Sequence, residues 1–297
     1  MTNPAALPSA DVWRWCVAGL VVICWGVNFA IAKHALNEFD LDAFNALRFT
    51  GMLVLAWTAT VVTGSCRPVH SEDRARLLAV SIVGFFGYLF GFSLGVSLTT
   101  AFSASVLLAL VPLWVTIIEA VRQGRPPAAR QALAVAVGVA GVGWFVAGRA
   151  EVDVGWGDLI AVLVAGAYAL YLLGSAPLVQ RYPALTLTTY GLTVGGLPVI
   201  ALCAPGMTDQ DWSRVTPAGW WSLAWTIVVP VLAAWTAWSW VQQRVSSARI
   251  APLLFLVPLI SGLTAWAFLS EVIRSAQVAG TLLVLTALWL NRRQPDL

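Results

Sequence analysis

The chain has 297 residues, of which 59% are hydrophobic and only 10% are charged. Soluble domains carry about 25% charged residues, so the composition excludes an ordinary water-soluble domain and indicates a protein embedded in a lipid bilayer. The formal net charge of +3 is too small, and too dispersed, for a nucleic-acid-binding protein. The four cysteines have no CxxC spacing, so we expect neither a disulfide framework nor a metal site, and no cofactor.

Ten apolar stretches follow one another along the chain, each close to the roughly 20 residues that cross a hydrocarbon core. The polar N-terminus lacks the basic region and cleavage site of a signal peptide, so we expect the first stretch to remain as a span. The connecting segments are short and leave no room for a soluble domain. The predicted spans cover residues 13–36, 43–63, 77–97, 100–121, 130–148, 157–179, 185–204, 218–241, 248–269 and 274–291.

Arginine residues are divided unequally between the two sides of this predicted bundle. Twelve of them lie in the even-numbered connections and the terminal segments, whereas only Arg149, Arg214 and Arg274 lie in the odd-numbered connections. Cytoplasmic loops of membrane proteins are enriched in basic residues. We therefore expect a multi-pass protein of the inner (plasma) membrane with both termini in the cytoplasm.

One heptapeptide occurs twice, as Leu107–Leu113 and again as Leu253–Leu259, with six of seven positions identical and an offset of 146 residues. An offset close to half the chain length predicts an internal duplication, with one repeat at 1–148 and the other at 149–297. Each repeat then holds five spans, an odd number, so the second must enter the membrane upside down. The expected fold is an all-α integral membrane protein with ten transmembrane helices in two inverted five-helix repeats around a central cavity. Many secondary transporters have this architecture.

Several short motifs resemble those of a known family. They are Trp25-Gly-Val-Asn-Phe29 with Lys33, Leu47-Arg-Phe49, Thr99-Thr100-Ala101 and the two Leu-Val-Pro segments. With ten spans, this set resembles the drug/metabolite transporter superfamily, in particular its ten-helix EamA-type exporters. Within that group the chain is most similar to bacterial exporters of amino acids, including aromatic ones. The resemblance implies transport of amino acids, cationic drugs or other metabolites. The chain departs from the family at Arg125, where a glutamate often follows the fourth span, and keeps that acid as Glu271 after the ninth.

Ionisable groups at membrane depth are few and are candidates for substrate contact or coupling. Lys33 either reaches the outer surface and pairs with a nearby acid, or meets a substrate carboxylate. Arg48 either hydrogen-bonds the carbonyls of helix ends or binds substrate. Glu119, the one acid inside an apolar run, either pairs with Arg122 or couples transport to protons. The scarcity of buried acids favours a facilitator that carries solute down its gradient.

Asn28 is the leading candidate for substrate contact. It shares a helical face with Trp25 near mid-membrane, where a buried amide needs a partner on another helix or on the substrate. Ser103 either presents a hydroxyl to the same region or bonds a carbonyl of its own helix. Aromatic stripes suit the side chain of an amino acid or a flat organic cation, and core packing is the alternative reading. The remaining candidates for substrate contact are Tyr88, Tyr168, Tyr171, Trp235, Trp238 and Gln242.

Two further patterns concern helix shape and packing. Pro112 and Pro258 occupy matching positions in the two copies of the heptapeptide and are predicted to distort the fourth and ninth spans around the cavity, as gating elements. Four glycines spaced three and four apart predict a smooth face of the third span, against which another helix packs closely. These glycines are Gly84, Gly87, Gly91 and Gly95.

The favoured function is a facilitative secondary transporter that exports amino acids or related small amphipathic metabolites by alternating access. The alternative is a proton-coupled exporter of drugs and organic cations from the same superfamily. We do not expect an enzyme, because the two histidines, His34 and His70, lie near membrane edges and no intramembrane acid pair accompanies them. A channel is a third reading. The expected partners are the solute and the lipid bilayer, not nucleic acid, and the oligomeric state is left open, with a monomer as the simplest case.

Overall fold

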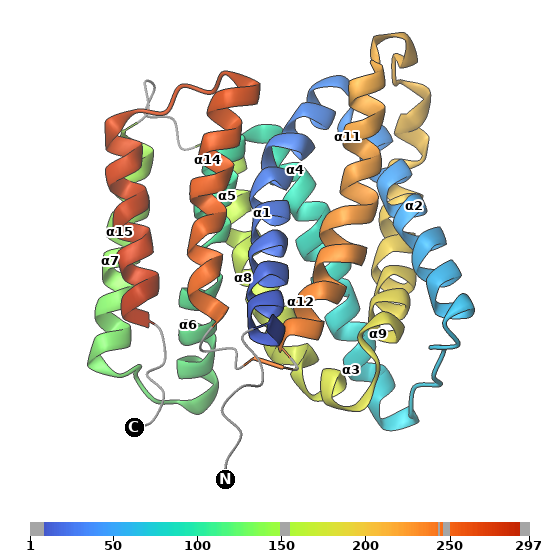
Figure 1. Cartoon of the computed structure of the whole chain (residues 1–297), viewed down its shortest axis with the longest axis horizontal. Coiled ribbons are helices and arrows are strands. Elements are labelled where there is room, and N and C mark those ends of the chain that lie inside the picture. The colour runs from blue at the N-terminus through green and yellow to red at the C-terminus, as the bar shows by residue number, and fades with distance from the viewer. Residues whose placement is uncertain (1–8, 149–154, 243, 246–249, 292–297) are drawn as a thin grey trace.

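The structure is a computed structural model that describes residues 9–148, 155–242, 244–245 and 250–291. These residues form helices joined by short connections and contain no strand (Figure 1). The all-helical class is therefore confirmed. Eight helical segments are long and apolar enough to cross a membrane. Two shorter apolar segments, Leu253–Leu269 and Ser275–Asn291, occupy the positions of the ninth and tenth predicted spans.

The first five predicted spans correspond to eight helical elements. These elements are α1 (Ser9–Glu38), α2 (Leu41–Val62), α3 (Ser71–Ser81), η1 (Ile82–Phe90), α4 (Gly91–Leu98), α5 (Ala101–Leu108), α6 (Val111–Gln123) and α7 (Ala129–Ala147).

The second set of five has more elements, because a π-helical segment interrupts its second span and two short 3-10 turns lie in the connection that follows. Its elements are α8 (Trp156–Arg181), α9 (Ala184–Gly191), η2 (Leu192–Gly196), α10 (Leu197–Cys203), η3 (Pro205–Thr208), η4 (Trp212–Arg214), α11 (Pro217–Ile227), η5 (Val228–Ala233), α12 (Ala234–Gln242), η6 (Ala251–Phe255), α14 (Leu256–Leu269) and α15 (Ser275–Asn291).

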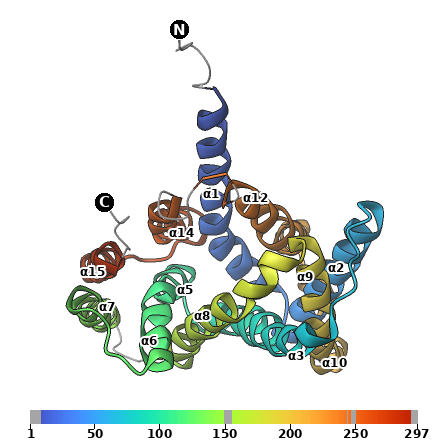
Figure 2. The ribbon, with the colours of Figure 1, turned by 90° about the horizontal axis from the view of Figure 1, so that it is seen from below.

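The bundle has two ends, which we name by its first and last helices. Helix α1 begins and helix α15 ends on the same side, the lower one in Figure 1; we call this the terminal side. Helices α7 and α15 form one edge of the bundle, α2, α9 and α10 form the other, and α1, α5 and α8 lie between them (Figure 2).

The two proline-containing heptapeptides coincide with changes in helix geometry. The fourth span is divided into α5 and α6 by two turn residues just before Val111 and Pro112. The ninth span begins as the 3-10 helix η6 and becomes the α-helix α14 at Leu256, two residues before Pro258. Proline lacks the amide donor and its ring crowds the preceding turn, so the predicted distortion of both spans is confirmed.

The glycine face of the third span packs against α8. A Cβ atom at Gly91 would lie 2.6 Å from Cγ2 of Val164, and one at Gly84 would overlap the ring of Tyr171. The absence of side chains at these positions lets the two helices approach each other closely, as predicted. This approach brings the aromatic residues of α8 next to those of η1.

Candidate functional site

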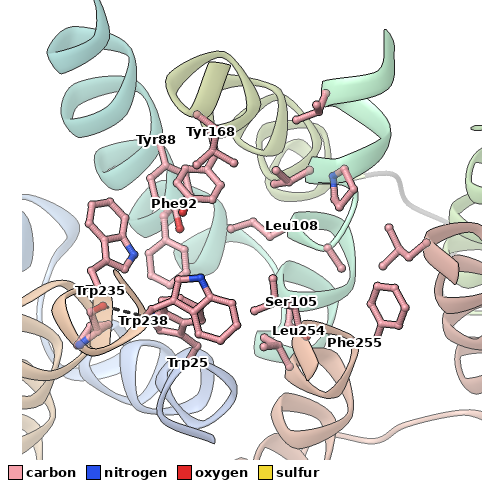
Figure 3. A pocket seen from close by; sticks show the side chains of 18 of the residues that line it. Trp25, Tyr88, Phe92, Ser105, Leu108, Tyr168, Trp235, Trp238, Leu254 and Phe255 are labelled. Atoms are coloured by element: carbon pink, nitrogen blue, oxygen red, sulfur yellow. Dashed lines mark hydrogen bonds between the residues drawn. The ribbon is translucent and has the colours of Figure 1, made fainter. Parts of the chain in front are cut away.

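A central cavity of about 680 Å³ lies between helices from both halves of the chain. This volume is within the 300–1,000 Å³ that is usual for small-molecule sites. Nine residues singled out from the sequence line it: Trp25, Asn28, Arg48, Tyr88, Pro112, Glu119, Tyr168, Trp235 and Trp238. Six of them are aromatic or proline side chains from five different helical elements, and several of these side chains surround the cavity in Figure 3.

Four predicted site residues lie outside the cavity lining. Lys33 and Ser103 belong to the packed region beyond the cavity, Tyr171 lies behind the aromatic residues that line it, and Pro258 is buried within α14. Ser103 is fully buried and accepts a hydrogen bond from the Thr100 hydroxyl at 2.7 Å. The side chain of Gln242, the last predicted site residue, lies outside the described part of the chain.

Three stacked rings form one side of the cavity; we call Tyr88, Tyr168 and Trp235 the aromatic wall (Figure 3). The Tyr88 and Tyr168 rings are 4.3 Å apart and inclined by 24°, and the Tyr168 and Trp235 rings are 6.3 Å apart and inclined by 21°. Tyr171 supports the wall from behind, 6.2 Å from Trp235 and inclined by 15°. The wall offers flat apolar faces to a ligand that carries an aromatic or aliphatic group.

Trp25 holds a second aromatic side of the cavity in place. Its indole Nε1 donates a hydrogen bond to the Pro230 carbonyl at 3.1 Å, and its ring lies 5.3 Å from that of Trp238. Pro230 lies in the π-helical segment η5, and such segments often occur at functional sites. Trp25 therefore satisfies a carbonyl where the eighth span departs from regular geometry.

Two polar side chains that line the cavity, from α1 and α2, each have a buried atom without a hydrogen-bond partner in the described part of the chain. Asn28 is 6% exposed, and its Oδ1 has no partner among the described residues. Arg48 is 1% exposed; its Nη1 donates to Ser93 Oγ at 3.0 Å, whereas its Nε has no partner in the described part of the chain. Arg48 thus bonds a hydroxyl and not the helix-end carbonyls that one sequence reading assigned to it.

Sequence reasoning missed some lining residues, including Gln131 and Asn291. Asn291 is the last residue of α15 and precedes two arginines, so its position indicates only a membrane edge. In the structure its Nδ2 donates to the Pro112 carbonyl at 2.9 Å, and its Oδ1 accepts from the Thr116 hydroxyl at 3.0 Å. No local sequence signal links residues that are 175 or more positions apart.

We expect Asn291→Ala to lower the free energy of unfolding by about 1–2 kcal/mol, because two hydrogen bonds worth about 0.5–1.5 kcal/mol each are lost. Denaturation of the purified protein in detergent measures the change. Thr116→Val is the matched partner variant, since its hydroxyl joins the same bridge. If the bridge is real, the double variant loses less stability than the sum of the single losses. Strict additivity would contradict it.

A second polar group lies at the end of the bundle opposite the terminal side. Lys33 Nζ donates to the carbonyls of Val96 and Ser97 at 3.0 Å each, at the end of α4. Glu271 accepts hydrogen bonds from the amides of Ala101, at 2.7 Å, and Phe102, at 3.2 Å, at the start of α5. A cation at a helix C-terminus and an anion at a helix N-terminus both interact favourably with the helix dipoles. We use the name Glu271 layer for Lys33, Val96, Ser97, Ala101, Phe102 and Glu271.

The cavity has no lining residue from the Glu271 layer. Its lining extends instead from Arg48, two turns into α2, to Glu119, Gln131 and Asn291 on the terminal side. The layer therefore separates the cavity from the opposite end of the bundle. Lys33 belongs to this separating layer and not to the surface pair with a nearby acid that one sequence reading assigned to it.

Comparison with known proteins gives three results. The sequence model of the EamA-like transporter family matches twice, at residues 13–147 and 155–293. An "Uncharacterized transporter" of Archaeoglobus fulgidus is 23% identical over 186 residues, which cover 63% of this chain and 66% of that protein, just under two thirds of its length. A solved structure described as "Crystal structure of protein" is 18% identical with a TM-score of 0.61, covering 92% of this chain and 94% of the other. The structural match supports the fold alone.

Proposed function

The chain belongs to the EamA-like transporter family, a family of membrane transporters, and on that premise we propose that it exports amino acids or related small amphipathic metabolites. The observation that carries the proposal is the pairing of an aromatic wall with two unsatisfied polar side chains, Asn28 and Arg48, in one cavity. An amphipathic solute has an apolar part that suits the wall and a polar part that suits those two groups.

The proposed mechanism is alternating access between two inverted repeats, 1–148 and 149–297. It is supported by a family match in each half and by a cavity whose lining comes from both. With both termini placed in the cytoplasm by the arginine distribution, the terminal side faces the cytoplasm. The cavity then extends toward the cytoplasm, and the Glu271 layer separates it from the outside. Rocking of the two halves exchanges these roles.

We propose that transport is facilitative. Glu119 is the single acid among the described residues that line the cavity, and it lies four residues before the end of α6. Coupled carriers often place a titratable group beside the substrate at mid-membrane. Glu119 lies near the terminal side of the bundle instead.

Export of organic cations is the alternative, and the aromatic wall is the observation that favours it, because flat rings attract cations. A buried acid that would complete such a site is missing from the described lining, in which Arg48 supplies a positive charge instead. The buried arginine makes the amino-acid reading the stronger of the two.

Uptake into proteoliposomes tests the proposal. The purified full chain is reconstituted, and uptake of labelled amino acids is measured with and without a pH gradient, beside protein-free vesicles. We expect saturable uptake without the gradient and counterflow when the vesicles are preloaded, which a channel would not give. Uptake that requires the gradient would overturn the facilitative mechanism. An absence of uptake for every amino acid, by protein shown to be folded, would overturn the substrate class.

We expect Trp235→Ala to raise the half-saturation concentration for an aromatic amino acid about tenfold, since loss of one stacking partner costs about 0.5–1.5 kcal/mol beyond the buried area. Initial uptake rates at graded concentrations measure this. Trp221→Ala is the matched control, because that indole is 77% exposed and lies outside the lining. Equal affinities of the two variants would contradict a role of the wall in binding.

A further inference from the structure

Arg48 is a charged side chain in a place where an unpaired charge is costly. Its side chain is 1% exposed, and no described carboxylate lies within salt-bridge distance of it. Its neighbours are the Ser93 hydroxyl and the faces of two rings, Phe44 and Phe92, whose centroids lie 5.7 and 5.6 Å from Cζ. Ring faces and one hydroxyl compensate a buried cation only in part. The described residues therefore supply no anion to compensate Arg48.

The geometry also indicates where that anion would bind. Ser93 and the two rings hold the guanidinium in position, while Nε is left without a partner in the described chain. Phe92, one of those rings, lines the cavity together with Arg48 itself. A guanidinium binds a planar carboxylate through two parallel N–H donors, and this pairing is among the strongest hydrogen-bonded contacts in proteins.

We propose that Arg48 is the carboxylate-binding residue of the transport site and that the transported solute is a monocarboxylate, such as a zwitterionic amino acid. This inference rests on the proposed function and narrows it to one chemical class. A substrate carboxylate completes the buried ion pair, and the free Oδ1 of Asn28 accepts an N–H from the ammonium group of the same class of solute. Organic cations bring a second positive charge next to Arg48 and are rejected.

A series of three related compounds tests the proposal on the unaltered protein. Uptake of labelled phenylalanine is competed with unlabelled phenylalanine, with phenethylamine, which lacks the carboxylate, and with 3-phenylpropionate, which lacks the ammonium group. We expect phenethylamine to compete at least about 100-fold more weakly than phenylalanine, because a buried charge loses its partner. Phenylpropionate should compete within about tenfold of phenylalanine, since it loses only the hydrogen bond from the ammonium group to the neutral amide oxygen of Asn28.

Substitutions at Arg48 separate substrate binding from a structural role. Arg48→Met should weaken competition by phenylalanine about 100-fold but strengthen competition by phenethylamine, because the positive charge that repels the amine is removed. Arg48→Lys keeps the charge but not the forked donors, so phenylalanine should compete with a strength between that in the unaltered protein and that in Arg48→Met. Arg76→Met, which removes an exposed arginine on α3, is the matched control and should behave as the unaltered protein. A purely structural role would lower competition by both compounds together.

The outcomes are distinguishable. Uptake of phenylalanine with equal competition by phenethylamine overturns the role of Arg48 and leaves the proposed function standing. Failure of folded protein to take up phenylalanine or any other amino acid overturns both. If Arg48→Met does not fold, the compound series on the unaltered protein decides, because it requires no substitution.

Discussion

Gly280→Leu is expected to abolish recovery of folded protein. A Cβ atom at Gly280 would lie 2.5 Å from the backbone nitrogen of Phe145 and 2.6 Å from its Cα. Backbone atoms cannot rotate away as a side chain can, so α15 must separate from α7. In a bilayer, helices associate through close packing and not through exclusion of water, and a separation of this kind removes the contact along the whole interface. The expected loss exceeds about 4 kcal/mol, the range of severe single substitutions.

The yield of monodisperse protein in detergent, and its thermal unfolding where any is recovered, measure this effect. Gly143→Leu is the matched control, because it lies on α7 itself and no atom would come within 4 Å of its Cβ. We expect this control to be recovered normally. A Gly280→Leu protein that purifies with unaltered thermal stability would contradict the packing of α7 against α15 described above.

Glu271→Leu is expected to open the end of the cavity that the Glu271 layer closes. The carboxylate bridges the end of α14 to the first two amides of α5, and these bonds must break when that end opens. Hydrogen bonds to a charged group contribute about 1.5–3 kcal/mol each. Their removal destabilises the closed arrangement relative to the open one, and a change of only about 1.4 kcal/mol shifts the equilibrium tenfold. Transport falls because the carrier no longer returns to the arrangement in which this end is closed.

Thiol labelling measures this shift. The four native cysteines are replaced by alanine, and Ala32→Cys is introduced on α1, where Ala32 is fully buried among residues next to the layer. An impermeant reagent applied from the side of the layer should react at least about ten times faster in the Glu271→Leu protein. Glu271→Gln keeps the size and an acceptor oxygen, so its increase should be smaller.

Glu72→Gln is the control for loss of an acid as such. Glu72 forms an exposed ion pair with Arg181 at 2.8 Å, and exposed pairs contribute little to stability. Its labelling rate should equal that of the unaltered protein. Equal labelling of the folded Glu271→Leu protein would show that the bridge does not hold this end closed.

Much of the fold was accessible from the sequence because membrane spans carry their signal locally. Composition and run length predicted the helices, and the prolines at 112 and 258 predicted where two of them change geometry. The glycine spacing predicted the close approach of the third span to another helix, although it did not identify α8 as that helix. Each of these signals depends on residues within a few turns of one another.

The site was accessible only in part. Aromatic stripes and the isolated amide predicted Trp25, Asn28 and the aromatic wall as candidates, and the structure places them around one cavity. The sequence could not distinguish the role of Lys33 from that of Arg48, since both are single cations near one end of a span. The structure places Lys33 in the Glu271 layer and Arg48 on the cavity.

The sequence by itself determined that this protein is a membrane-embedded helical bundle, because hydrophobicity and helix-breaking residues act locally. Only the tertiary structure decided which face of each helix meets the cavity. That choice depends on the rotation of a helix against neighbours far away in the chain, as when Asn291 reaches Pro112 or Glu271 reaches Ala101. Hydropathy is nearly uniform around such helices, and packing between distant segments fixes their rotation.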